Sequence, residues 1–560
     1  MRLFLLAISL AFTLSTQAWA QNQAGVAMPD RYSAQVAQNI IQQGGNAIDA
    51  AIAASFTLAV TYPEAGNLGG GGFMTIHYQG ENFFLDYRET APLNAHKDMY
   101  LDENGDVIPY RSLLGYQASG VPGTVMGMWQ AHQRFGQLPW RKLLEPAIQL
   151  AENGFKVHPK LAETATWYQA WSAEKGHNLN FAAYFGGLQT DQTFKQPELA
   201  ETLKRIAEGG AQEFYQGKTA ELLVKQMQQA DGLISREDLA AYQVKWRKPI
   251  TATWQGFEVV SAPPPSSGGI ALIQLLLMKA HLNYEFEGLY HNSAEYIHLL
   301  AEIKKRVYAD RAEYLGDPDF FDVPVESLID AAYIEKRAEQ VDPIRISPTP
   351  DIKPGLAESE QTTHFSIIDV HGNAVSNTTT LNMPFGSGIV IEGAGFLMND
   401  EMDDFSAKPG VPNIFGVIGH EANAIEPGKR MLSSMTPTIL LKDGRVAAVV
   451  GTPGGSTIIT SVFQTLINLI EHSMTPQQAV DANRVHHQLW PKDEIGYHTT
   501  LPASVIQALS DMGYQVKARQ FFGDVQLLSR SAFGEVQAAS DYRGRGESRV
   551  WAQSPGLVIE

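Results

Sequence analysis

The sequence predicts a large α/β (α+β) protein in which short strands alternate with longer helices. Two β-prone runs, 364–369 and 374–381, lie on either side of a short turn-forming segment. Residues 140–250 contain amphipathic stretches that favour helices. The C-terminal part alternates strand-like runs with helical stretches near 458–472 and 503–512. These patterns are consistent with this fold class and leave the arrangement of its layers open.

The N-terminus has the pattern of a secretory signal peptide. Met1-Arg2 is a short basic start, and the apolar run 3–14 is followed by Ala18-Trp19-Ala20, a typical cleavage site. The alternative is a membrane anchor, but the run is shorter than the ~20 residues that a spanning helix needs. We therefore expect residues 1–20 to be removed and the mature chain to be periplasmic or secreted.

Several further elements can be predicted in the first two thirds of the chain. Residues 44–62 form an Ala-rich run typical of a buried helix, and 270–281 predict an apolar helix after the rigid loop 263–269. The segment 67–73, NLGGGGF, is too glycine-dense for a helix or a regular strand, and it lacks the Lys-Ser/Thr of a phosphate-binding loop. We interpret it as close backbone packing near an active site. Residues 345–361 are rich in Pro, Ser and Glu, which favours an exposed segment open to chain cleavage.

Composition excludes several classes of function. The chain has 560 residues, 44% of them hydrophobic, which is enough for a large core. The formal charge of -18 argues against a nucleic-acid partner. The absence of cysteine from the sequence excludes disulfides, a cysteine nucleophile and zinc bound by cysteine.

Thr362 is a candidate nucleophile. A threonine inside a chain reacts poorly, but its own α-amine can serve as the base if the chain is cut immediately before it. The segment Gln361-Thr362-Thr363 raises the hypothesis that the Gln361–Thr362 bond is a self-cleavage site. An ordinary β-hairpin with a Thr-rich strand is the alternative.

The predicted hairpin places a second hydroxyl beside Thr362. Asp369 favours the first position of a turn, and Gly372 suits the left-handed residue of a three-residue loop. That loop pairs Asp369 with Asn373 and sets Thr362 opposite Thr380 on the same face. A two-residue loop would instead turn Thr380 to the other face.

The segment around Thr362, ESEQTTHFSIID at 358–369, closely resembles the processing site of bacterial γ-glutamyltransferases (γ-glutamyl transpeptidases), which are N-terminal-nucleophile hydrolases. Other resembling segments follow in order along nearly the whole mature chain, so the set is far more specific than one motif. They are GNAIDAAIAASFTLAVTYPEAGNLGGGGFM at 45–74, LDYRETAP at 85–92, ASGVPGTV at 118–125, APPPSSGG at 262–269, YADRAEYLGDPDF at 308–320, NDEMDDFSAKPGVPN at 399–413, KRMLSSMTPT at 429–438 and GTPGGS at 451–456.

The resemblance implies a four-layer αββα sandwich, in which two antiparallel sheets are covered by helices. It also implies that cleavage gives a large subunit, 21–361, and a small subunit, 362–560, that remain one intertwined heterodimer. Neither part is expected to be an independent domain. No cofactor or metal is expected.

The same resemblance implies the chemistry and the site residues. Thr362 would attack the γ-carbonyl of glutathione or a related γ-glutamyl donor, and the γ-glutamyl ester would pass to water or to an amino-acid or dipeptide acceptor. In the implied site Thr380 supports the nucleophile, Gly454 and Gly455 form the oxyanion hole, Arg88, Ser433 and Ser434 bind the α-carboxylate, and Asn382, Glu401 and Asp404 contact the amino-acid part of the donor.

Some residues keep a structural interpretation, and two segments depart from the family pattern. Arg88 could pair with Glu89 or another acid, and Asp403 is as easily structural as ligand-binding. Phe415, in a segment that resembles the lid loop, stands where some bacterial members carry Tyr, which predicts altered lid dynamics or acceptor access. The segment 540–548, SDYRGRGES, departs from the usual SDPR pattern.

Two other functions remain as alternatives. One is a cephalosporin (glutaryl) acylase of the same superfamily, and the other is an inactive periplasmic binding protein. The sequence has no G-x-S-x-G elbow, H-E-x-x-H pair or Walker A motif. We interpret His486-His487 as local structure rather than as ligands.

Overall fold

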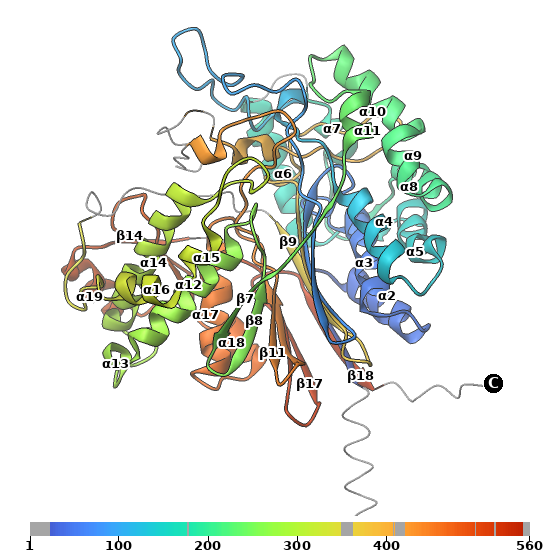
Figure 1. The fold of residues 1–560 in the computed structure, drawn as a ribbon. Helices are drawn as coiled ribbons and strands as arrows, with labels where there is room; N and C mark the ends of the chain where they lie inside the picture. Colours follow the sequence, from blue (N-terminus) through green and yellow to red (C-terminus); the bar gives the residue numbers. More distant parts are fainter. Residues whose placement is uncertain are drawn as a thin grey trace, which may run out of the picture.

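Two antiparallel β-sheets pack face to face between two layers of helices (Figure 1). The computed structural model describes residues 23–175, 179–348, 362–406, 408, 421–498, 500–519 and 522–552. Among these residues no helix has the length and apolar character needed to cross a membrane. The layer order is the expected αββα sandwich.

Over the described residues the first sheet has seven strands, and each neighbouring pair runs antiparallel. In spatial order the strands are β18 (Glu547–Ala552), β1 (Gln23–Met28), β9 (Thr363–Ile368), β10 (Ala374–Thr380), β2 (Gly71–Tyr78), β3 (Glu81–Asp86) and β6 (Lys245–Arg247).

In the part of the chain that the structure describes, the second sheet has six antiparallel strands, and two smaller sheets lie outside the sandwich. The six are β17 (Val536–Ser540), β16 (Gln526–Arg530), β12 (Arg445–Gly451), β11 (Thr438–Lys442), β8 (Phe257–Ser261) and β7 (Ile250–Trp254). The smaller sheets contain β13 (Val485–His486), β14 (Glu494–Tyr497) and β15 (Gln515–Ala518), and β4 (Phe155–Lys156) with β5 (Thr193–Phe194).

Side-chain alternation along the strands builds the layers. Ile367 of β9 packs toward the helices, whereas the next residue, Ile368, packs between the sheets against residues of β11, β12 and β16. Val26 and Ala27 of β1 divide in the same way. Because successive side chains of a strand point to opposite faces, the first sheet contributes to two hydrophobic cores at once.

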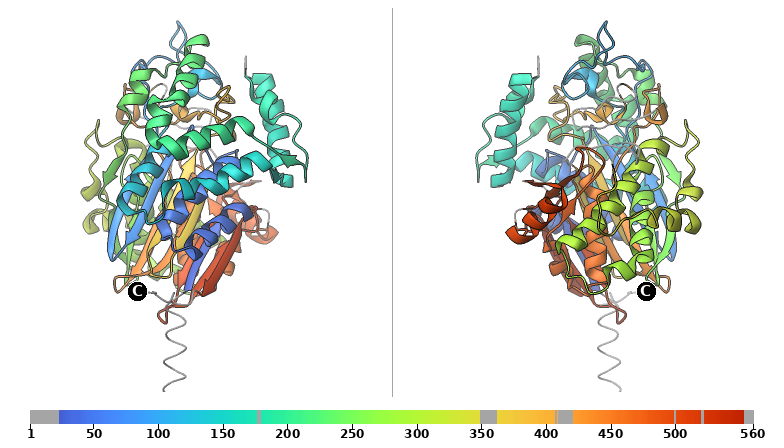
Figure 2. Two further views of the ribbon diagram at one scale, coloured as in Figure 1. Left: turned by 90° about the vertical axis from the view of Figure 1, so that its right-hand side faces the viewer. Right: turned by 90° about the vertical axis from the view of Figure 1, so that its left-hand side faces the viewer.

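The outer face of the first sheet is covered by helices from the N-terminal half, which face the viewer in the left view of Figure 2. Helix α3 is central to this layer: Asn46 and Asp49 form a capping box at its start, and all of its residues are buried. The helices of this half are α2 (Arg31–Gln42), α3 (Ala47–Thr61), α4 (Thr124–Phe135), α5 (Trp140–Asn153), α6 (Pro159–Lys175), α7 (Phe181–Phe185), α8 (Pro197–Gly209), α9 (Ala211–Gln216), α10 (Lys218–Gln229) and α11 (Arg236–Ala241).

Helices from both sides of residue 362 cover the second sheet, and the right view of Figure 2 looks onto them. Apolar residues of α12, α14 and α17 form one core with this sheet. The helices on this side are α12 (Gly268–His281), α13 (Asn283–Phe286), α14 (Ala294–Tyr314), α15 (Val325–Leu328), α16 (Ala331–Ala338), α17 (Thr457–Ile470), α18 (Pro476–Asp481) and α19 (Ala503–Met512).

Both sheets contain strands from before and after residue 362 that pair with one another. In the first sheet β1 lies between β18 and β9, and β2 pairs with β10. In the second, β8 pairs with β11. A cut before Thr362 would therefore separate the chain without separating a domain, because the sheet hydrogen bonds join the two parts.

The structure confirms most of the expected elements and corrects one. Helices α3, α12, α17 and α19 fall on the predicted ranges. The glycine segment was expected to lie outside regular strands, but β2 already begins at Gly71. Gly71 and Gly72 are held there by pairing with Thr380 and Thr379 of β10, so tertiary pairing overrides the low strand propensity of glycine.

Candidate active site

The β9–β10 hairpin has the register that the sequence predicts. The Asp369 N–H donates to the Asn373 carbonyl at 2.9 Å, Gly372 adopts φ +84°, and the pairs run from Ile368–Ala374 to Thr363–Thr379. The paired residues end at Thr363–Thr379, and the same register continued by one residue sets Thr362 opposite Thr380. Both threonines line the same cavity, and Thr362 is 7% exposed.

Thr362 lies on the face of β9 that is turned toward the second sheet. His364, two residues further along, lies against Gly451 of β12, and Ser366 donates to the Gln526 carbonyl of β16. Burial lowers the pKa of His364 to about 3, so this imidazole is neutral. The nucleophile candidate thus sits at the end of a polar row between the sheets.

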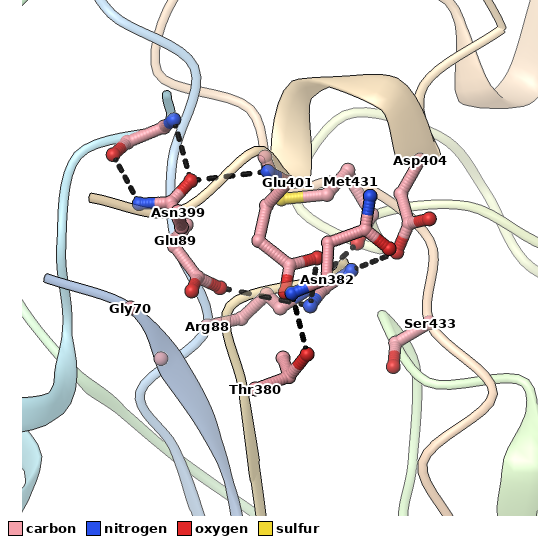
Figure 3. A network of polar contacts seen from close by, with 12 residues as sticks. Gly70, Arg88, Glu89, Thr380, Asn382, Asn399, Glu401, Asp404, Met431 and Ser433 are labelled. Atoms are coloured by element: carbon pink, nitrogen blue, oxygen red, sulfur yellow. Dashed lines mark hydrogen bonds and ion pairs between the residues drawn. The ribbon is translucent and has the colours of Figure 1, made fainter. Parts of the chain in front are cut away.

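Thr380 and Asn382 follow one another at the end of β10. The Asn382 N–H donates to Thr380 Oγ1 at 2.7 Å, which fixes one lone pair of that hydroxyl (Figure 3). Asn382 adopts φ +78°, a left-handed conformation that Asn tolerates better than most residues. Its side-chain amide donates to the Asp400 carbonyl at 3.0 Å, which holds the amide group beside the cavity.

Arg88 lies just after β3 and is surrounded by acids from the 3-10 helix η3 (Glu401–Asp404) and from its own neighbour (Figure 3). Its Nη1 is 2.7 Å from Glu401 Oε2, and its Nη2 donates to Asp404 Oδ2 at 2.5 Å. Glu89 is farther away, with 3.6 Å between Nη1 and Oε2. These ion pairs agree with the structural interpretation of Arg88 as an ion-pair partner.

Burial shifts the protonation of Glu89 and Glu401. Burial raises the pKa of Glu89 to about 7 and raises that of Glu401 well above its usual range, while Arg88 lowers both. Three carboxyl groups thus share one guanidinium group. A ligand with an ammonium group would relieve this imbalance, whereas a ligand with a second anion alone would increase it.

Asp403 accepts a hydrogen bond from a residue outside the Arg88 cluster. The Ser112 hydroxyl donates to Asp403 Oδ1 at 2.5 Å. Burial raises the pKa of Asp403 to about 7. These contacts favour the structural interpretation of Asp403, whereas Asp404 lines the cavity.

Ser433 and Ser434 are held by the loop that precedes α12. The Ser433 N–H donates to the Pro265 carbonyl at 2.9 Å, and the Ser267 N–H donates to the Ser433 carbonyl at 2.7 Å. The hydroxyl of Ser267 donates to the same carbonyl at 2.7 Å. The two serines therefore face the cavity from a rigid backbone.

Gly454 and Gly455 connect β12 to α17. They adopt φ +135° and +54°, and a Cβ on Gly454 would lie 2.4 Å from Thr457 Oγ1. Their carbonyls accept from the N–H groups of Thr457 and Ile458, each at 3.0 Å, at the start of the helix. The positive end of a helix next to a reacting carbonyl favours the negative charge that develops on its oxygen.

Residues far apart in the sequence meet in this one cavity, which is about 20 Å³ in volume. That is room for about one water molecule. A wider, open cavity of about 630 Å³ lies elsewhere, near His291 and His472, and none of the residues singled out from the sequence lines it. The lining residues of the small cavity are Arg88, Thr362, Thr380, Asn382, Glu401, Asp404, Ser433, Ser434, Met435, Gly455 and Ile458.

Some expectations fall outside the described residues. Gln361, the signal segment and Phe415 are among these. His486 is described, and its ring nitrogens contact Thr460 at 3.0 Å and Gln488 at 3.0 Å, which agrees with local structure. Over the described ranges, no group of three or more His, Cys, Asp or Glu side chains could hold a metal ion.

The comparisons with known proteins identify the family. A family model described as gamma-glutamyltranspeptidase matches residues 33–551. The chain belongs to the γ-glutamyltranspeptidase family. The glutathione hydrolase proenzyme of Pseudomonas aeruginosa is 57% identical over 541 residues, 96% of each chain. That of Escherichia coli is 44% identical over 527 residues, which are 93% of this chain and 90% of the relative.

Solved structures agree with this γ-glutamyltranspeptidase assignment. The γ-glutamyltranspeptidase of Pseudomonas nitroreducens complexed with L-DON is 56% identical, with a TM-score of 0.57, over 58% of this chain and 96% of that one. A cephalosporin acylase from Bacillus halodurans has a TM-score of 0.82 at 26% identity, over 95% of this chain and 96% of that one. The fold is thus shared by transpeptidases and acylases.

Two residues of this γ-glutamyltranspeptidase site were not assigned a role from the sequence. Arg311, in α14, donates through Nη2 to Ser434 Oγ at 3.2 Å and through Nε to Ser267 Oγ at 2.9 Å. Both Arg311 and Ser267 lie in segments that resemble the family, and this resemblance is the sequence feature that could have pointed to them. Nothing local in either segment indicates that they meet beside Ser434.

Proposed function

We propose that this chain is a γ-glutamyltransferase and glutathione hydrolase that activates itself by cleaving the Gln361–Thr362 bond. One observation carries the proposal. Thr362 shares a cavity with the Thr380 hydroxyl and with the Arg88, Glu401 and Asp404 charges. A nucleophile next to groups that complement both charges of an amino acid suits a γ-glutamyl donor.

The first reaction is self-cleavage. The Thr362 hydroxyl attacks the Gln361 carbonyl, its proton passes to the departing amide nitrogen, and the peptide bond becomes an ester. Water then hydrolyses the ester, which leaves a carboxylate on Gln361 and a free α-amine on Thr362. The interleaved strands β1, β9 and β18 support a product that stays together as a heterodimer of 21–361 and 362–560.

The second reaction is acyl transfer. A free α-amine has a pKa of about 7.7–8.0, so roughly a tenth or more of it is unprotonated near neutral pH and can accept the Thr362 hydroxyl proton. The hydroxyl oxygen attacks the γ-carbonyl of glutathione or a similar donor, and the N–H groups at Gly454 and Gly455 are proposed to receive the oxyanion. The leaving amine takes the proton, and the γ-glutamyl ester then passes to water or to an amino-acid or dipeptide acceptor.

Donor recognition follows from the charges around the cavity. Arg88, Ser433 and Ser434 would bind the α-carboxylate, and Glu401 and Asp404, with the Asn382 amide, would bind the α-ammonium group. The cavity of about 20 Å³ in the uncut chain is too small for a γ-glutamyl group. We infer that cleavage and donor binding open it.

The acids also favour a γ-glutamyl donor over a glutaryl one. A glutaryl group has the same chain length and no ammonium group, so it would leave Glu401 and Asp404 without their ligand. This separates the proposed activity from that of a cephalosporin acylase, whose fold is the same. The apolar segment 3–14 and Ala18-Trp19-Ala20 support export to the periplasm or the medium.

Intact mass and N-terminal identification of the purified protein test the proposal, beside Thr362→Ala. We expect two chains, one of which begins at Thr362, and a single uncut chain for the variant. Release of p-nitroaniline from γ-glutamyl and glutaryl p-nitroanilides then compares the two donor classes. An uncut wild-type chain would refute self-activation, and a preference for the glutaryl compound would favour the acylase.

A further inference from the structure

Arg311 contacts a residue that lines the donor cavity, although it does not line the cavity itself. It belongs to α14, and its side chain is 3% exposed. Nε donates to Ser267 Oγ at 2.9 Å, and Nη2 donates to Ser434 Oγ at 3.2 Å. Arg311 does not line the cavity, whereas Ser434 does. The arginine therefore acts on the cavity through a serine.

The Ser434 hydroxyl is the acceptor in its hydrogen bond with Arg311, which determines how its own hydrogen can be oriented. A hydroxyl group has one hydrogen to donate and two lone pairs. Because Ser434 Oγ accepts from a guanidinium N–H, that lone pair is occupied and the hydroxyl hydrogen can point toward the cavity. A donor polarised by a neighbouring cation makes a stronger hydrogen bond to a carboxylate.

Ser267 holds the Nε side of the Arg311 guanidinium group by accepting its hydrogen bond. Its hydroxyl donates to the Ser433 carbonyl at 2.7 Å, so its lone pairs are left for Arg311. Ser266 and Ser433 also form a bridge between the two backbone segments. The planar fork of arginine can hold two hydroxyls at fixed positions, which a lysine ammonium group on a flexible stem cannot do equally well.

Charge reinforces this geometry. Burial lowers the pKa of Arg311 to about 10, while electrostatic interactions with Tyr308 and Asp404 raise it. The side chain therefore stays cationic near neutral pH. Its charge adds to that of Arg88 on the side of the cavity that carries the two serines, and it opposes the surplus of acids around Arg88.

We propose that Arg311 is a positioning residue of the α-carboxylate subsite, because its guanidinium group orients the Ser434 hydroxyl toward the donor's carboxylate. This inference rests on the proposed function, which assigns the α-carboxylate to Arg88, Ser433 and Ser434. Arg311, which is buried and lies outside the cavity lining, then determines specificity for a free carboxylate.

The test uses two donors that differ only at the α-carboxyl group: γ-glutamyl p-nitroanilide and its α-carboxamide analogue. For Arg311→Met we expect kcat/KM for the carboxylate donor to fall about 10- to 100-fold, as for a lost hydrogen bond to a charged group. The loss should appear mainly in KM, and the carboxamide donor should change by less than about threefold, because its neutral group gains little from the cation.

Further variants separate positioning from general damage. Ser434→Ala should reproduce the loss, and the double variant with Arg311→Met should lose little more than the worse single one, since both remove the same hydrogen bond. Arg311→Lys should restore part of the preference. Arg337→Gln is the matched control: Arg337 pairs with Asp310, the neighbour of Arg311, at 2.8 Å and does not line the cavity. It should leave the ratio between the donors unchanged.

Failure of the Arg311 inference and failure of the proposed function give different results in these assays. If Arg311→Met slows both donors equally, or slows neither, the inference is wrong. If that variant does not self-cleave or fold, Arg311→Lys and Ser267→Ala still decide, because both should lower the preference for the carboxylate donor. A wild-type protein that releases p-nitroaniline from neither donor would refute the proposed function instead.

Discussion

Arg88 and Glu401 form a buried ion pair, with 2.7 Å between Nη1 and Oε2 and both side chains 1% exposed. Asp404 shares the same guanidinium group. A γ-glutamyl donor carries one group for each side of this pair: its α-carboxylate can replace the acids at Arg88, and its ammonium group can replace Arg88 at the acids. We infer that donor binding exchanges ion pairs, which keeps the desolvation cost of the buried charges low.

Glu401→Gln should change the pH dependence of donor binding. Burial raises the pKa of Glu401, so lowering the pH protonates this carboxyl group earlier than an exposed one. A neutral carboxyl group binds an ammonium group less well, so KM for the γ-glutamyl donor should rise as the pH falls through this pKa. Glutamine has no such titration. KM measured from about pH 5 to about pH 9 should show a flatter profile for Glu401→Gln, and parallel profiles would contradict the prediction.

Thr380→Val should slow both self-cleavage and turnover. The change keeps the shape of the side chain but removes the hydroxyl that shares the cavity with Thr362. We expect kcat to fall about 10- to 100-fold, the effect of one hydrogen bond to a charged reacting group. Thr380→Ser restores the hydroxyl and serves as the control. Equal rates for the valine and serine variants, by gel analysis of cleavage and by p-nitroaniline release, would show that the hydroxyl has no part in the reaction.

Gly455→Ala should damage the proposed oxyanion site. Gly455 adopts φ +54°, which strains any residue with a Cβ. If the strain moves its N–H group, kcat should fall about 10²- to 10³-fold, while KM should change much less. Gly444→Ala is the matched control, because Gly444 has φ +72° in the turn between β11 and β12 and a Cβ there would meet nothing within 4 Å. A similar loss of kcat in both variants would indicate general strain rather than a catalytic role.

Asp403→Asn should change how stability depends on pH. Burial raises the pKa of Asp403 to about 7, whereas the unfolded chain should titrate near about 3.9. Between these values the folded state holds a proton that the unfolded state has lost. The contribution of Asp403 is therefore fully present below about pH 4, and the free energy of unfolding then falls by up to ~1.4 kcal/mol per pH unit as the pH rises toward 7.

Urea unfolding of Asp403→Asn beside the wild type measures this directly. The variant should lack that part of the slope, so its stability relative to the wild type should be higher at about pH 8 than at about pH 4.5. Activity of the folded variant should persist, because the carboxyl group of Asp403 is bonded to Ser112 and does not line the cavity. A stability difference that stays constant with pH would contradict the assigned pKa.

Arg484→Met should destabilise the fold strongly. Arg484 Nη2 lies 2.5 Å from Asp541 Oδ2, and both side chains are fully buried. Asp541 also binds Arg543, so the atypical segment SDYRGRGES is part of a buried charge network. Removing one partner leaves a buried charge, which costs about 3–5 kcal/mol. Lys204→Met, which removes a half-exposed pair with Glu152, should cost less than about 1 kcal/mol. Similar losses for both would refute the argument.

Elements with local signals can be predicted from the amino-acid sequence alone. The turn chemistry of Asp369 and Gly372 sets the β9–β10 register, and that register alone places Thr362 opposite Thr380. Helices α3, α12 and α19 were equally clear, because composition and periodicity act within a single segment. The family resemblance supplied the layer order, which no local pattern contains.

The contacts between distant groups, and the charges that these groups carry, depend on the folded structure. Arg88 bonds to Asp404 across 316 positions and Arg311 to Ser434 across 123, and β2 begins at Gly71 because β10 pairs with it. The raised pKa values of Glu89 and Glu401 likewise arise from burial by the whole fold. Local patterns record turns and periods, whereas long-range contacts and desolvation depend on every segment that packs around a site.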